Sequence, residues 1–244
     1  MPLCKLCGEE KKLVDAHILP RAFWQLPLAS EQAAKLMSNI ADDRPAKTLK
    51  GVYDSGILCE ACDLVLGRLD QHASESLLQG RNFEPFFKDG LEVGRHYTEA
   101  DANIISQFIA SVAWRASISS HRFYKSVRLG PYEAAIAAWL RDESDMPEGI
   151  GTVMAEFDQD DVPMLDPHKT RTDGVRYWVL YGDRFVFYLK ADKRATPQSL
   201  RRFALEETGV VMTAVRKWQG SKERAIMQNI AGRNPNAFGR PNRR

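Results

Sequence analysis

CKLC at residues 4–7 and CEAC at residues 59–62 are the two short stretches that decide how the N-terminal part of this chain folds. Together they hold all four cysteines of the sequence, so no cysteine is left over. In a reducing compartment, two CxxC pairs typically supply four thiolates to one tetrahedral zinc ion. The sequence therefore predicts a structural Zn²⁺ site rather than disulfides, an iron–sulfur cluster or a redox dithiol. Its ligands are Cys4, Cys7, Cys59 and Cys62.

The composition is that of a globular protein. The chain has 244 residues, of which 44% are hydrophobic and 27% charged, enough for one large domain or two modest ones. No apolar run approaches the roughly 18 residues of a transmembrane helix. The N-terminus begins directly with the first cysteine pair and has no apolar signal segment, so we expect a cytoplasmic protein without membrane partners.

Side chains close to the cysteines are candidates for chemistry, because a zinc ion held by four cysteines has no open position for a substrate. DAHILP occupies residues 15–20, Asp54 precedes the second pair by five residues, and Asp63 follows it directly. On a strand, Asp15 and His17 share a face. On a helix beginning near Cys62, a stripe holds Asp63, Gly67 and Asp70. An imidazole facing these carboxylates could hold a hard cation and a water molecule.

The two segments, residues 4–23 and residues 53–70, resemble the zinc-knuckle branch of the HNH endonucleases, which have a treble-clef, ββα-metal fold. The resemblance covers roughly residues 1–75. It implies that His17 is the general base, that Asp54 takes the place of the asparagine orienting that base, and that Asp63 binds a catalytic Mg²⁺ or another divalent ion. Asp15 and Asp70 are further candidate ligands of that ion. Ala16 departs from the family pattern, where an acidic residue or histidine ligates the metal.

Each of these side chains also has a simpler interpretation. His17 could be a structural histidine that pins the knuckle. Asp63 could cap the helix after the second cysteine pair. Asp70 could be a solvated acid or could pair with Arg68 or Arg21.

Positive charge gathers at the C-terminal end. From residue 213 onward eight basic residues face one acidic residue, a net charge of +7, whereas the whole chain carries +2. The remainder of the chain is therefore negative, at −5. Such a tail is typical either of nucleic-acid binding or of a disordered, solubilising end. The candidate nucleic-acid contacts are Arg21, Arg240, Arg243 and Arg244.

The rest of the chain predicts a helical segment followed by a small αβ domain. Helices are predicted over residues 30–40, from a capping box of Thr98 and Asp101 through apolar residues at helical spacing as far as Ala116, from Pro131 to Leu140, and over residues 198–207 and 221–230. Strands are predicted over residues 152–157 and, as a hairpin, over residues 175–180 and 185–189. The predicted boundaries are a zinc module at 1–78, a helical segment at 79–145, an αβ domain at 146–232 and a basic disordered tail at 233–244.

The sequence as a whole predicts an α+β protein. Its leading functional interpretation is a metal-dependent endonuclease that hydrolyses DNA phosphodiester bonds. The resemblance to the HNH endonucleases implies a role in host defence or mobile-element processing. The alternative is a catalytically inactive zinc module that binds nucleic acid or, through the C-terminal region, a protein partner.

Overall fold

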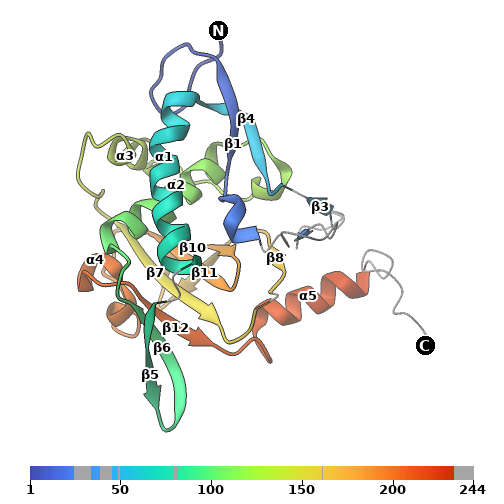
Figure 1. Cartoon of the computed structure of the whole chain (residues 1–244), viewed down its shortest axis with the longest axis vertical. Coiled ribbons are helices and arrows are strands. Elements are labelled where there is room, and N and C mark those ends of the chain that lie inside the picture. Colours follow the sequence, from blue (N-terminus) through green and yellow to red (C-terminus); the bar gives the residue numbers. More distant parts are fainter. Residues whose placement is uncertain (25–33, 39–45, 49, 80–81, 161, 234–244) are drawn as a thin grey trace.

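The computed structural model describes residues 1–24, 34–38, 46–48, 50–79, 82–160 and 162–233. It has an α+β fold, in agreement with the sequence prediction (Figure 1). The strands are β1 (Leu13–His17), β2 (Ala34–Met37), β3 (Ala46–Thr48), β4 (Tyr53–Cys59), β5 (Phe83–Lys88), β6 (Leu91–Tyr97), β7 (Ile150–Phe157), β8 (Met164–Leu165), β9 (His168–Thr172), β10 (Val175–Gly182), β11 (Phe185–Ala191) and β12 (Met212–Arg216). The helices are α1 (Glu60–Ser74), α2 (Ala102–Ile118), α3 (Tyr132–Leu140), α4 (Leu205–Thr208) and α5 (Lys222–Arg233), with short helical turns at Arg21–Trp24, Glu75–Gln79, Arg122–Tyr124 and Arg201–Phe203.

The N-terminal part is a two-stranded sheet followed directly by a helix. Strand β1 pairs antiparallel with β4, and α1 begins at the residue after β4 ends. Ala16 lies opposite Asp54 and His17 opposite Tyr53. Because successive residues of a strand point to opposite faces, Ala16 and Asp54 share one face and His17 and Tyr53 the other. Ala16 is fully buried whereas Tyr53 is 45% exposed, so the His17 face is the outer one.

The larger sheet has seven strands in the order β5, β6, β12, β7, β11, β10 and β9. The hairpin predicted at residues 175–189 is confirmed as β10 and β11. Strands β5 and β6 come from the segment predicted to be helical, and β6 pairs with β12 from the C-terminal segment. The predicted boundary at residue 145 is therefore not a structural boundary in the sheet. Strands β5 and β6, which precede it, belong to the same sheet as the strands of the C-terminal segment (Figure 1).

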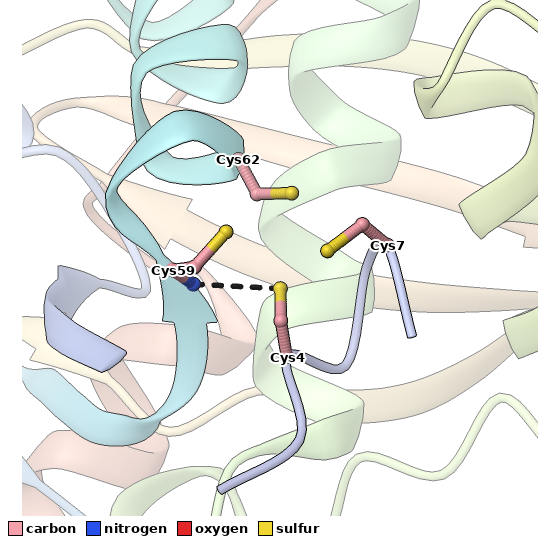
Figure 2. Close-up of side chains that lie close together, drawn as sticks. All are labelled: Cys4, Cys7, Cys59 and Cys62. Carbon is pink, nitrogen blue, oxygen red and sulfur yellow. Dashed lines mark hydrogen bonds between the residues drawn. The ribbon is translucent and has the colours of Figure 1, made fainter. Parts of the chain in front are cut away.

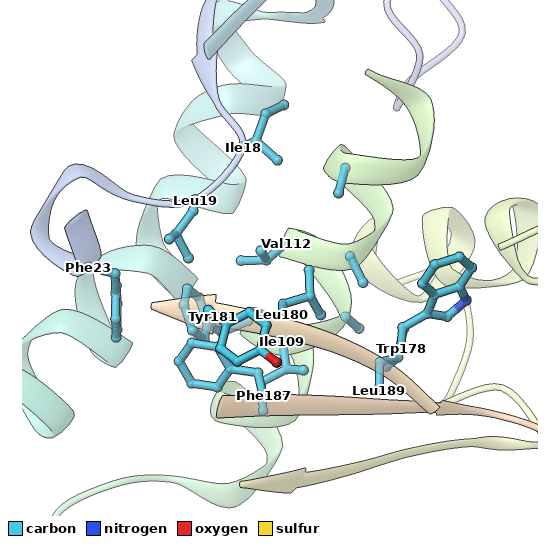
Figure 3. Packing of buried hydrophobic residues seen from close by; sticks show 14 of the residues in the cluster. Ile18, Leu19, Phe23, Ile109, Val112, Trp178, Leu180, Tyr181, Phe187 and Leu189 are labelled. Atoms are coloured by element: carbon cyan, nitrogen blue, oxygen red, sulfur yellow. The ribbon is translucent and has the colours of Figure 1, made fainter. Parts of the chain in front are cut away.

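Helix α2 lies between the seven-stranded sheet and the N-terminal part of the chain. Figure 3 shows Ile109 and Val112 of α2 above the apolar side chains of β10 and β11, with Ile18 and Leu19, which follow β1, beside them. The side chains of Ile18, Leu19, Ile109 and Val112 are each at most 2% exposed. One continuous cluster of buried residues runs from Cys4 to Ile230, so the three predicted segments share a single core.

The smaller elements differ more from the prediction. Helix α2 lies where it was predicted, but its N-cap is Asp101, which accepts hydrogen bonds from the Asn103 and Ile104 N–H groups, and not Thr98. Helix α3 begins after Pro131, as predicted. The helix predicted over residues 30–40 is wrong for residues 34–37, which form β2, and its other residues lie outside the described residues except Ser38. Residues 198–207 form two short helical turns rather than one helix. No helix within the described ranges is long and apolar enough to cross a membrane.

Candidate metal centre and the His17 site

The four cysteines come together where the first CxxC segment, residues 4–7 (the first knuckle), meets the end of β4 and the first turn of α1. Their Sγ atoms all lie within 4.8 Å of one another (Figure 2). Tetrahedral ZnS₄ coordination with Zn–S bonds of about 2.3 Å places the sulfur atoms about 3.8 Å apart. Thus the predicted ligand set is brought together by the fold and fits one metal ion. The donor set of four thiolates is typical of structural zinc.

Backbone geometry shapes this cluster. Gly8 adopts a positive φ of 75° and donates its N–H to the Cys4 carbonyl over 2.9 Å, which closes the first knuckle. The Cys59 N–H lies 3.4 Å from the Cys4 Sγ. Burial opposes ionisation of Cys4, but backbone hydrogen bonds from Cys7, Cys59 and Leu6 outweigh it and lower the thiol pKa to about 7. Burial and the neighbouring thiols raise the pKa of Cys62. A bound divalent cation would stabilise all four thiolates.

His17 ends β1 and is oriented by a backbone carbonyl. Its Nε2 lies 3.0 Å from the Lys50 carbonyl oxygen. Because a carbonyl oxygen only accepts, Nε2 carries the proton of this hydrogen bond, and Nδ1 of the neutral ring keeps its lone pair. The ring lies beside Tyr53, with centroids 6.2 Å apart. The next residues, Ile18 and Leu19, are buried, so the backbone that carries the imidazole is held in place by packing.

Asp63 lies in the first turn of α1 and interacts electrostatically with His17. It is half-buried. Burial raises the pKa of its carboxyl and Asp70 adds to this rise, while Arg115 and His17 oppose it. The N-cap residue of α1 is Cys59, so the capping role that was the alternative for Asp63 is wrong. The structure therefore leaves a half-buried carboxylate within electrostatic reach of the imidazole.

Gly67 follows Asp63 by one helical turn, as the predicted stripe requires. A Cβ atom added at Gly67 would meet nothing within 4 Å. The backbone of α1 is thus open to a large group at this point. Among the other predicted residues, Asp15 is exposed and lies at a register irregularity of β1, and Arg21 is exposed at the start of a short helical turn. Arg240, Arg243 and Arg244 lie outside the described residues.

Asp54 does not orient His17. Its carboxylate points to the face of β4 opposite the imidazole and accepts hydrogen bonds from the Ser119 hydroxyl, the Ser120 backbone N–H (each 2.8 Å) and the Ser120 hydroxyl (3.1 Å). It also accepts from the Gly56 N–H over 2.8 Å. The expected role is corrected here, because Asp54 instead fastens β4 to the end of α2. The orienting partner of His17 is the Lys50 carbonyl, which no side-chain pattern in the sequence could indicate.

Replacing Asp54 with alanine is expected to lower the free energy of unfolding by about 1.5–3 kcal/mol, because hydrogen bonds to a charged group are lost. Burial opposes ionisation of Asp54, but the bonds from Gly56, Ser119 and Ser120 outweigh it and lower the carboxyl pKa below its usual 3.8. A pKa lowered by folding stabilises the protein above the unfolded-state pKa and ceases to do so as pH falls through the folded-state value.

Urea unfolding of wild type and Asp54→Ala tests this expectation. The difference between them should be full at pH 7 and shrink as the pH falls below about 4. Asp15→Ala, which removes an exposed acid on the neighbouring strand, is the matched control and should change stability little. A difference between wild type and Asp54→Ala that stays constant from pH 7 to pH 2 would contradict this role of Asp54.

Asp70 is paired, but with neither Arg68 nor Arg21. Both of its carboxylate oxygens accept from Arg115, over 2.7 and 2.9 Å. Arg115 is only 1% exposed. The sequence signal for its burial is its place within the apolar stretch of α2, where a charged side chain requires a partner. Asp70 is therefore part of an ion pair rather than an available ligand.

Within the part of the chain that the structure describes, the four cysteines are the only group of three or more metal-ligating side chains that converge. Asp15, Asp63 and Asp70 are not brought together into one cation site with His17. Comparison with protein-family models, with curated proteins and with solved structures found no match to this chain.

Proposed function

We propose that the chain is a metal-dependent endonuclease of the HNH type, in which a zinc-stabilised ββα unit hydrolyses DNA phosphodiester bonds. The observation that carries this proposal is the placement of His17 at the outer edge of β1, with Nε2 held by the Lys50 carbonyl and Asp63 of α1 nearby. The order of the elements β1, β4 and α1, with one cysteine pair before β1 and the other at the junction of β4 and α1, supports the same fold type.

The roles follow from this geometry. Nδ1 of His17 accepts a proton from the attacking water, and the Lys50 carbonyl stabilises the resulting imidazolium through Nε2–H. A divalent ion such as Mg²⁺, held by Asp63, would supply positive charge at the scissile phosphate. Gly67 leaves room for the sugar–phosphate backbone along α1. Ala16 lies on the buried face, so a ligand at that position would point away from His17.

The second candidate is a non-catalytic zinc module that binds nucleic acid. The observation that favours it is the engagement of Asp54 and Asp70 in contacts with residues of α2 and its C-terminal end, so that neither carboxylate is available to ligate an ion beside His17. The two candidates differ in metal content, because the enzyme binds a second divalent ion and the binding module holds zinc alone.

Asp63→Asn is expected to weaken binding of a second divalent ion about tenfold or more, because the ion loses its charged ligand. The measurement is Mn²⁺ binding to the zinc-loaded full chain, followed by electron paramagnetic resonance. Glu60→Gln, which neutralises an exposed acid in the same first turn of α1, is the matched control and should leave Mn²⁺ binding unchanged. Wild-type protein that binds no Mn²⁺, or binds it equally well as Asp63→Asn, would favour the binding module.

Removing residues 234–244 is expected to weaken DNA binding and to flatten its dependence on salt. The deleted segment contains Arg240, Arg243 and Arg244. Each lost phosphate contact should reduce the slope of log K against log salt concentration by about 0.9. Fluorescence anisotropy with a labelled duplex measures both quantities, and replacing the three arginines with glutamine separates charge from chain length. An unchanged slope would assign these residues no part in binding.

A further inference from the structure

The guanidinium of Arg115 is the most heavily engaged charged group beside the proposed catalytic site. It lies on α2, and Nη1 donates to the His17 carbonyl over 2.8 Å. The fork formed by Nη1 and Nη2 grips the Asp70 carboxylate. Nη2 also donates to the Ser111 hydroxyl over 3.1 Å. One side chain from α2 thus joins the last residue of β1 to α1.

Burial makes this arrangement rigid. A buried charge is costly unless it is paired and its hydrogen-bonding groups are satisfied. Arg115 meets that condition only when the His17 carbonyl, Asp70 and Ser111 are all in place. The planar guanidinium also fixes the directions of its N–H groups, so it constrains orientation as well as distance. Displacement of the His17 peptide would leave a buried donor without a partner.

The position of the imidazole depends on the same peptide. The His17 side chain leaves the backbone at the residue whose carbonyl Arg115 holds, and the Lys50 carbonyl fixes the other end of the ring. Two contacts therefore set the ring, one at its backbone and one at Nε2. Arg184 offers a comparison: it is also buried and paired, with Glu156, but it lies in the turn between β10 and β11 and has no described contact with His17.

We propose that Arg115 is a positioning residue for His17, so that α2 is part of the catalytic unit and not only a support for the sheet. This inference rests on the proposed function of His17. A lysine at this position keeps the charge near Asp70 but replaces the planar fork with a single ammonium group. It cannot reproduce the same set of bonds to the His17 carbonyl, Asp70 and Ser111. The ring should then lose its fixed orientation.

The test uses the zinc-loaded full chain and three variants, namely Arg115→Lys, Ser111→Ala and the matched control Arg184→Lys. Displacement of a catalytic group by about 1 Å costs up to about 100-fold in rate. In Arg115→Lys, kcat for DNA cleavage should therefore fall about 10- to 100-fold, with KM within about twofold of wild type. Arg184→Lys should keep kcat, although it also disturbs a buried ion pair.

Nuclear magnetic resonance of ¹⁵N-labelled histidine supplies a readout that does not depend on activity. The ring signals of His17, assigned with His17→Gln, should move in Arg115→Lys and less strongly in Ser111→Ala, and stay in place in Arg184→Lys. If Arg115→Lys fails to fold, Ser111→Ala carries the test, because it removes only one bond of the guanidinium.

The outcomes separate the two proposals. If Arg115→Lys folds and both kcat and the His17 signals are unchanged, the positioning role is overturned. If Arg115→Lys does not fold, unchanged His17 signals in Ser111→Ala overturn it. A wild-type chain that does not cleave DNA, but whose His17 signals move in Arg115→Lys and not in Arg184→Lys, would overturn the proposed function and support the placement of His17 by Arg115.

Discussion

His17→Ala is expected to reduce metal-dependent DNA cleavage by about 10²- to 10⁴-fold, the usual contribution of a general base. The physical reason is that Nδ1 is the unprotonated nitrogen of a ring whose Nε2 is already engaged with the Lys50 carbonyl. That hydrogen bond is exposed, so its loss should cost at most about 1 kcal/mol of stability. The measurement is single-turnover cleavage of a labelled duplex, with zinc content and thermal unfolding followed on the same samples.

His96→Ala is the matched control for this variant. It removes a histidine of β6, outside the ββα unit, and should leave the cleavage rate unchanged. Loss of zinc or unfolding in His17→Ala would instead support the structural interpretation of this histidine. Full cleavage by a folded His17→Ala protein would exclude the general-base role.

Loss of the zinc site is expected to have the largest effect on stability. Cys59→Ser removes one thiolate and, with it, the connection between the first knuckle and α1. Binding energy of a structural zinc ion is folding energy, because the unfolded chain does not preform the site. For a chain of this length, a loss of about 5 kcal/mol corresponds to a fall in Tm of about 10–20 °C. Differential scanning calorimetry and zinc analysis check the expectation together.

The structure indicates how far this loss should spread. The Lys5 ammonium donates to the Ile118 carbonyl over 2.8 Å, and Arg141 donates to the Leu6 carbonyl over 2.6 Å. Release of the knuckle should therefore loosen its contacts with α2 and α3 as well as α1. Ser55→Ala, an exposed change on β4, should leave Tm unchanged. A Cys59→Ser protein with wild-type Tm and about one zinc per chain would contradict the four-cysteine site.

Local patterns in the sequence predicted those structural features that are determined by residues close together along the chain. The CxxC spacing identified the four cysteines that converge and could hold a metal ion, and apolar periodicity located α2. Such patterns could not reveal that Asp54 bonds Ser119 and Ser120, because these residues lie 65 and 66 positions away. Nor could they pair Asp70 with Arg115, since that contact exists only once α1 and α2 pack together.

For the candidate site, too, the sequence indicated side chains but not the backbone contacts that orient them. The sequence singled out His17 and Asp63, which interact electrostatically in the structure, but the group that orients His17 is the main-chain carbonyl of Lys50. Every non-proline residue has such a donor and acceptor, so their use leaves no trace in residue types. The β5–β6 hairpin was missed for another reason: its place in the sheet comes from pairing with β12, more than a hundred residues later.

The most direct test of the central claim is conversion of supercoiled plasmid to open-circular or linear DNA by the zinc-loaded full chain. Wild type and His17→Ala are compared after removal of loosely bound metal, with and without added Mg²⁺. The proposed function requires cleavage by wild type that depends on Mg²⁺ and is lost in His17→Ala while both proteins keep about one zinc ion. Intact plasmid with folded, zinc-loaded wild type, or equal cleavage by both proteins, would contradict it.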